Sequence, residues 1–135
     1  MKHITSADDM NAMLAAESAA LFVWVNWSMH AQHGSEIFRA VRSRFTDGAA
    51  ATSISWFVAD LSEPGATPVA SSLHNWLESQ DKEGSIGLFP SVDLGNGSTV
   101  LVKNGTIVGF EPCALQAGAD GLARRLETVF NATSN

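Results

Sequence analysis

Apolar positions recur along the chain with two different periods, and each period predicts a different kind of element. Residues 20–25 form a continuous apolar run rich in β-branched and aromatic side chains, which is typical of a strand covered on both faces, and 53–59 form a second such strand. Spacings of three and four residues instead predict amphipathic helices over 34–45, 68–80 and 116–130. A further helix is expected to start at Ser6, with Asp9 three residues later as a variant of the capping box.

Turn residues divide these elements and set their order. Lys103-Asn104-Gly105 lies between alternating segments at 98–102 and 106–110, which predicts a β-hairpin. Thr67 followed by Pro68 predicts the N-cap of the third helix, and glycine-rich residues 81–97 are expected to form a long loop. With a short strand at 2–5, the order is β-α-β-α-β-α-β-β-α. Right-handed crossovers make the first three strands parallel, so we expect one α/β domain over 1–135, a three-layer α/β/α sandwich with a mixed central sheet.

Composition limits the classes of protein and of binding partner that we expect for this chain. The 135 residues are 45% apolar and 16% charged, as in a soluble globular protein, and the net charge is −6. Arg39, Arg42 and Arg44 are interspersed with Glu36 and Asp47, so they predict a solvated helix face and not a nucleic-acid interface. No apolar run has the length of a signal peptide or a membrane span, and there is a single cysteine. We therefore expect a cytoplasmic protein with neither nucleic-acid nor membrane partners.

Three segments resemble the thioredoxins. The run LFVWVNWSMHAQHGSEI at 21–37 has the layout of that family's central strand, active-site turn and following helix. Phe57-Val58-Ala59-Asp60 resembles the strand that ends in an acidic turn, and residues 100–110 resemble the family's Lys-Asn-Gly hairpin. Together with the predicted order of elements, the likeness extends over nearly the whole chain. It implies a thioredoxin-like fold.

The departures from the family's pattern fall on its chemistry. Thioredoxins carry Trp-Cys-x-x-Cys at the active-site turn, where this chain has His30 and then the degenerate motif Ala31, Gln32, His33 and Gly34. The buried acid of redox-active members falls at Val25, and the cis-proline falls near Gly97. Thiol–disulfide exchange needs one thiolate to attack and a second sulfur to resolve the mixed disulfide. The resemblance therefore implies the scaffold without dithiol oxidoreductase activity.

The remaining candidate chemistry is sparse. His30, His33 and Cys113 are the one set of residues with metal-ligand character, but a His-x-x-His spacing on a turn occurs often by chance. We therefore predict no metal, no cofactor and no catalytic residue. Cys113, at the start of the last helix, is the one candidate for a monothiol nucleophile. Trp27 matches the tryptophan that precedes the active-site turn, and we expect it to support that turn.

Our leading functional hypothesis is a non-redox thioredoxin-fold module, of the chaperone type, that binds a protein or peptide of unknown identity. Three loops are expected to converge at the carboxyl end of the parallel strands, where ligands of open α/β sheets bind. The candidate binding surface consists of Trp27, His30, His33, Gly97, Ser98 and Cys113. The alternative is a monothiol, glutathione-dependent or metal-assisted enzyme that uses Cys113 on the same scaffold. A purely structural role, with an edge strand of the terminal hairpin available for pairing, is the third hypothesis.

Overall fold

The computed structural model describes residues 1–46, 53–62, 68–89 and 91–132. Its elements follow the predicted order, with one added short 3-10 helix. They are β1 (Lys2–His3), α1 (Ala7–Ala15), β2 (Ser18–Trp24), α2 (Met29–Thr46), β3 (Ile54–Asp60), α3 (Ala70–Gln80), η1 (Lys82–Gly84), β4 (Thr99–Lys103), β5 (Thr106–Glu111) and α4 (Ala114–Phe130).

The five strands form one mixed sheet in the order β1-β3-β2-β4-β5. β3 pairs in parallel with both β1 and β2, with Leu21 opposite Phe57, and β4 pairs antiparallel with β2, with Ala20 opposite Leu101. β2 is therefore central, and its residues 18–23 are all buried. The predicted parallel pair beside an antiparallel hairpin is confirmed.

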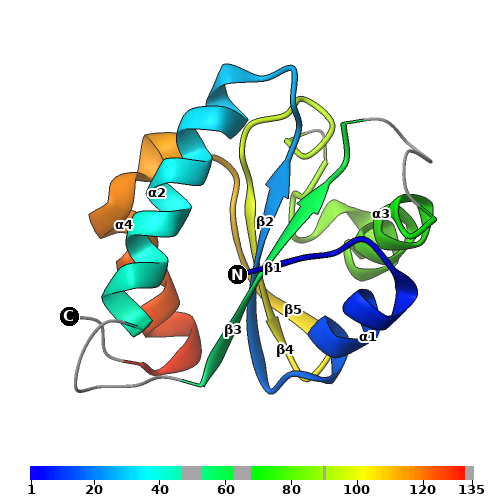
Figure 1. Cartoon of the computed structure of the whole chain (residues 1–135), viewed down its shortest axis with the longest axis horizontal. Helices are drawn as coiled ribbons and strands as arrows, with labels where there is room; N and C mark the ends of the chain where they lie inside the picture. The colour runs from blue at the N-terminus through cyan, green and yellow to red at the C-terminus, as the bar shows by residue number, and fades with distance from the viewer. Residues whose placement is uncertain (47–52, 63–67, 90, 133–135) are drawn as a thin grey trace.

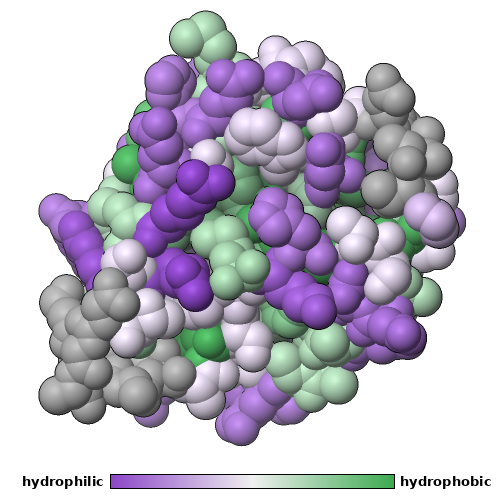
Figure 2. Space-filling model, in the orientation of Figure 1, coloured by the Kyte–Doolittle hydropathy of each residue, from purple (hydrophilic) through white to green (hydrophobic). Residues whose placement is uncertain are grey.

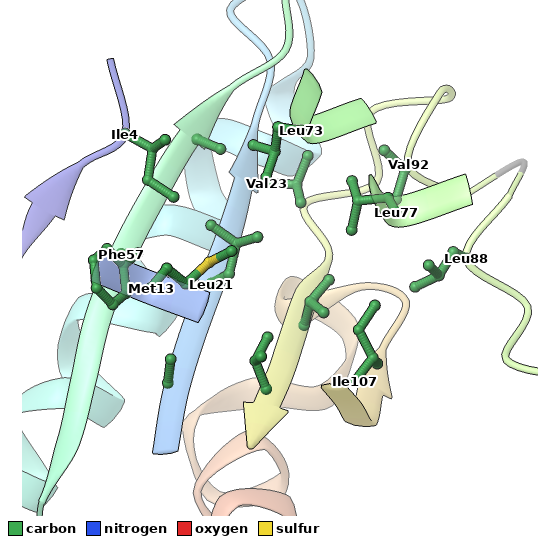
Figure 3. Close-up of a cluster of buried hydrophobic side chains, with 14 of the residues drawn as sticks. Ile4, Met13, Leu21, Val23, Phe57, Leu73, Leu77, Leu88, Val92 and Ile107 are labelled. Carbon is green, nitrogen blue, oxygen red and sulfur yellow. The ribbon is translucent and has the colours of Figure 1, made fainter. Parts of the chain in front are cut away.

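Helices cover both faces of the sheet, with α2 and α4 on one side and α1 and α3 on the other (Figure 1). Alternate residues of β2 point to opposite faces, so Leu21 and Val23 join the core under α1 and α3, while Phe22 joins the core under α2 and α4. The first of these cores is shown in Figure 3, where Leu73 and Leu77 of α3 face Val23 and Val92. The five residues that the pattern predicts to be buried are buried, at 1% exposure or less: Phe22, Val41, Leu73, Leu101 and Leu126.

The hairpin turn has the geometry that its sequence predicts. Asn104 and Gly105 both have positive φ, at 50° and 78°, as the two central residues of a type I′ turn require. Asparagine tolerates this region and glycine enters it without cost, so this dipeptide favours the turn over other conformations.

Helix starts are where the structure differs most from the prediction. Ser6 caps α1 as expected, accepting a hydrogen bond from the N–H of Asp9 at 3.2 Å. However, α2 begins at Met29 instead of 34 and α4 begins at Ala114 instead of 116. The predicted N-cap Thr67 lies outside the described residues. The early start of α2 puts the whole degenerate motif inside a helix.

The face shown in Figure 2 intersperses polar and apolar residues, without one continuous apolar area. Among the described residues, no helix is both long enough and apolar enough to cross a membrane.

Candidate functional site

The start of α2 is fixed by one buried hydroxyl, that of Ser28. Its Oγ accepts a hydrogen bond from the N–H of Ala31 at 3.3 Å, in the manner of an N-cap. The same Oγ donates to the carbonyl of Gly95 at 2.6 Å. Ser28 is 8% exposed, so both bonds are shielded from water. One side chain therefore joins the first turn of α2 to the loop that precedes β4.

Gly97 brings that loop into direct contact with α2. Its φ is +75°, and a Cβ added there would lie 2.8 Å from the carbonyl oxygen of His30 and 3.2 Å from the Cα of Ala31. Glycine is therefore required both by the backbone conformation and by the close approach. This is where the resemblance places the family's cis-proline, and in this chain a glycine backbone occupies the position.

Residues 111–114, just before and at the start of α4, are joined to the same loop by hydrogen bonds. The carbonyl of Gly97 accepts a hydrogen bond from the N–H of Ala114 at 2.9 Å, at the start of α4. Ser98 Oγ donates to the carbonyl of Pro112 at 2.8 Å, and the Ser98 carbonyl accepts from the N–H of Val23 at 2.9 Å. Residues 27–34, 94–98 and 111–114 thus meet at the carboxyl end of β2. We call this region the turn-end site.

Burial divides the candidate residues into two groups. Gly97, Ser98 and Cys113 are buried, whereas Trp27, His30 and His33 are exposed. The hydrogen bonds of Gly97 and Ser98 hold the three segments together, whereas Trp27, His30 and His33 are presented to solvent.

The two positions that carry cysteine in thioredoxins are also buried. Ala31 is 0% exposed in the first turn of α2. A Cβ added at Gly34 would lie 3.4 Å from Cζ of Phe22 and 3.7 Å from Cβ of Ala114. An added Cβ would therefore make ordinary van der Waals contact with the Phe22 ring and with Ala114, so Gly34 is closely surrounded by packed side chains.

Trp27 does more than support the turn. A Cβ added at Gly95 would lie 2.8 Å from Cη2 of Trp27, so the tip of the indole rests on the loop backbone. The side chain is also 59% exposed, so it presents apolar surface to solvent. Met29 and Leu94, on the same segments, are 68% and 60% exposed. We call Trp27, Met29 and Leu94 the apolar patch.

A pocket of about 380 Å³ has Trp27 of this patch in its lining. Val25 and Trp27 line it from the end of β2, Leu61 from the residue after β3, and Val92 from the loop. Its polar groups include His74 of α3 and Asp93 of the loop. Apolar walls with a few polar groups are typical of small-molecule and side-chain sites.

His74 is bound on both sides by carboxylates. Its Nε2 lies 3.2 Å from Oδ1 of Asp93, and its Nδ1 lies 3.1 Å from Oε1 of Glu78. Neither ring nitrogen is left to accept a proton from Ser71, which also lines the pocket, so the residues do not form a hydrolytic triad. The carboxylates also lie on opposite sides of the ring, so the three groups do not converge on one metal ion. Sequence analysis missed this pair because Asp93 lies in the loop whose conformation was not predicted.

Asp81 holds that loop in place. Its Oδ1 accepts hydrogen bonds from the N–H groups of Ile86 at 2.7 Å and Gly87 at 3.3 Å, and its Oδ2 accepts from Leu88 at 2.8 Å. Burial raises the pKa of Asp81, but these donors and the N–H of Phe89 together outweigh it and hold the pKa below its ordinary value of 3.8. The ionised carboxylate thus organises the segment that leads to Val92 and Asp93.

His30, His33 and Cys113 do not form a metal site. Within the part of the chain that the structure describes, no three His, Cys, Asp or Glu side chains are arranged to hold a metal ion. Cys113 is 7% exposed and lies at the N-cap of α4, where its N–H donates to Oε2 of Glu111 at 3.4 Å.

Comparisons with solved structures identify the fold. Thioredoxin from Malassezia sympodialis superposes with a TM-score of 0.63 at 12% identity, covering 96% of this chain and 90% of that one. Thioredoxin from Fasciola hepatica gives 0.58 at 11% identity, covering 98% and 100%, and thioredoxin from Plasmodium falciparum gives 0.59 at 13%, covering 95% and 98%. No protein-family sequence profile and no curated protein sequence matches the chain.

The chain therefore has a thioredoxin-like fold and, with a single cysteine, lacks the Cys-x-x-Cys pair. At these identities the likeness extends to the fold alone.

Proposed function

We propose that this protein is a non-redox, thioredoxin-fold binding module that recognises a peptide or protein segment at the turn-end site. The observation that carries the proposal is the exposed indole of Trp27, which lines the pocket of about 380 Å³, together with exposed Met29 and Leu94 on the same segments of the turn-end site. Tryptophan and methionine are enriched in the centres of protein interfaces, and exposed apolar groups beside a pocket are a common binding arrangement.

The turn-end site is rigid enough for recognition. The bonds from Ser28, Gly97 and Ser98 fix all three segments, so the surface is formed before a ligand arrives. A preformed site loses little conformational entropy on binding. Ala31 and Gly34 provide no reactive group, and this favours binding over chemistry.

Selection from a random phage-displayed peptide library tests the proposal. The wild-type protein is the bait, and a Trp27→Ala, Leu94→Ser double variant is the counter-selection. Because both side chains are mostly exposed, the double variant is expected to keep its fold, and circular dichroism checks that. Enriched peptides are then synthesised and titrated against the ¹⁵N-labelled protein.

The expected result is that amide shifts cluster in residues 25–34, 92–98 and 111–114. Shifts that cluster on the outer face of α4, or a selection that enriches nothing over the double variant, would reject the proposal.

A monothiol enzyme that uses Cys113 is the alternative. At 7% exposure the thiol is poorly placed to attack a bulky substrate, because reactive cysteines are partly exposed. We expect Cys113 to react with Ellman's reagent slowly in the native protein and completely in about 8 M urea, a concentration that denatures most small domains. Native reaction as fast as that of free cysteine would favour the enzyme.

A further inference from the structure

We infer that the pocket beside Trp27 receives the side chain of a lysine or arginine from the bound segment. The inference rests on the proposed function and adds the chemical class of the residue that is recognised. It depends on three features of the pocket: its apolar walls, its charge and the indole ring in its lining.

The walls suit an aliphatic stem. Val25, Leu61 and Val92 present apolar surface, and the volume of about 380 Å³ lies near the lower end of the range for ligand pockets. Long basic side chains bury their methylene groups against such surfaces while the charged head stays near polar groups or water. One side chain fits this pocket better than a large cofactor does.

Among the described residues that line the pocket, Asp93 carries the one carboxylate, and Glu78 contacts the other nitrogen of the His74 ring from outside the lining. With Glu78 counted, two carboxylates face at most one positive charge on His74. No lysine or arginine is among the described residues that line the pocket, and the whole chain has a net charge of −6. A cation is thus attracted there, whereas an acidic side chain is repelled.

Asp93 is placed to accept the cation. Its side chain is 60% exposed, and its bond to His74 uses Oδ1. Among the described residues Oδ2 has no partner, so one carboxylate oxygen remains for an ammonium or guanidinium donor. The bond to His74 meanwhile restrains the carboxylate on the pocket wall.

Trp27 provides the third feature. Its indole lines the pocket and is 59% exposed, and tryptophan is the aromatic ring that attracts cations most strongly. A basic side chain in the pocket therefore has both the indole ring and the Asp93 carboxylate in the surrounding wall. A neutral apolar side chain would gain binding free energy only from contact with the apolar walls.

Four blocked amino acids test the inference in NMR titrations of the ¹⁵N-labelled protein. The probes are the Nα-acetyl N-methylamides of arginine, lysine, norleucine and glutamate. We expect the arginine and lysine probes to shift the amides of Leu61, Val92 and Asp93, and to bind roughly fivefold or more tightly than norleucine. The glutamate probe is expected to give no saturable shift.

Asp93→Asn is the decisive variant, because asparagine keeps an oxygen for His74 and removes the charge. It should weaken the arginine probe to the level of norleucine and leave norleucine unchanged. Asp120→Asn, which removes an exposed carboxylate from α4 across the sheet, is the matched control and should change neither.

Equal binding of arginine and norleucine, or arginine binding that survives Asp93→Asn, would overturn the inference. So would the absence of saturable shifts with arginine. The peptide selection decides the proposed function separately, because it does not require a basic residue. Selected peptides that shift Trp27 and Leu94 but contain no lysine or arginine would keep the binding module and reject the basic-residue pocket.

Discussion

Two glycines with similar positive φ angles show how neighbouring atoms decide the effect of a substitution. Gly97 and Gly87 have φ of +75° and +81°. A Cβ added at Gly97 meets the His30 carbonyl oxygen at 2.8 Å, whereas one added at Gly87 meets nothing within 4 Å. Comparing alanine substitutions at the two positions therefore measures what the close approach of the Gly97 loop to α2 contributes to the loss of stability.

Gly87→Ala should therefore destabilise the protein by about 1–2 kcal/mol, the usual penalty for the left-handed region. Gly97→Ala should cost at least ~1 kcal/mol more, because backbone atoms must also separate. Urea denaturation measures both. Equal losses would show that the loop moves away from α2 without strain.

The redox behaviour of the protein also depends on single residues. With Cys113 as the single cysteine, no dithiol can cycle, so the rate of insulin reduction with dithiothreitol should equal that of buffer. Cys113→Ser should behave identically. Turnover above background in either protein would contradict this prediction.

The resemblance to thioredoxins predicted which segments meet at the turn-end site, but not which of their side chains are exposed. The resemblance placed Gly97 and Cys113 near the degenerate motif, and the hydrogen bonds of Gly97 and Ser98 bring these segments together. Their burial depends on packing between elements, which has no local signature. The contact between His74 and Asp93 likewise could not be predicted from the residues around either position, because it depends on how the loop folds back on α3.

At the scale of elements, apolar periodicity together with capping and turn residues predicted every strand and α-helix among the described residues, but it missed the start of α2 by five residues. Residues 29–33 contain no apolar stripe, so the pattern began at Ile37 and its helix at 34. The missed signal is Ser28, whose side chain caps the helix. Strand boundaries shifted by only one or two residues, because the sheet buries the same apolar positions that define the pattern.

Leu101 tests the predicted register of β4. It is 0% exposed and packs in the core under α2 and α4. Leu101→Ala should cost about 2–5 kcal/mol, the usual range for truncating a buried leucine. Val108→Ala on β5, where the side chain is 44% exposed, is the control and should change stability by no more than about 0.5 kcal/mol. A urea midpoint for Leu101→Ala equal to that of the control would contradict the register.

At the scale of the whole molecule, two carboxylates link stability to pH. The backbone N–H of Thr5, with side-chain bonds from Lys2, Ser6 and Thr5, outweighs burial and lowers the pKa of Asp9 from 3.8 to about 2. Asp81 is shifted in the same direction by its backbone donors, which outweigh burial. A carboxylate with a lowered pKa in the folded state contributes stability above its unfolded pKa and loses it as pH falls through the folded value.

The urea midpoint should therefore fall as the pH is lowered from about 4 to about 2. In an Asp9→Asn, Asp81→Asn double variant this fall should be smaller, with a lower midpoint at neutral pH. Asp8→Asn, which changes an exposed neighbour on α1, should keep the wild-type profile. A double variant whose acid profile matches the wild type would refute the assignment.

The pairings of β4 also set the order in which the chain can fold. Its partner β5 follows directly after the two-residue turn Asn104-Gly105, so the pairing of β4 with β5 joins residues that are close in sequence. Its other partner, β2, lies roughly eighty residues earlier in the chain, and closing so long a loop costs entropy before any contact repays it. We therefore expect the hairpin to form early and its docking on β2 to be slow. Because Gly97 and Ser98 lie directly before β4, the contacts between the three segments of the turn-end site can form only when that docking occurs.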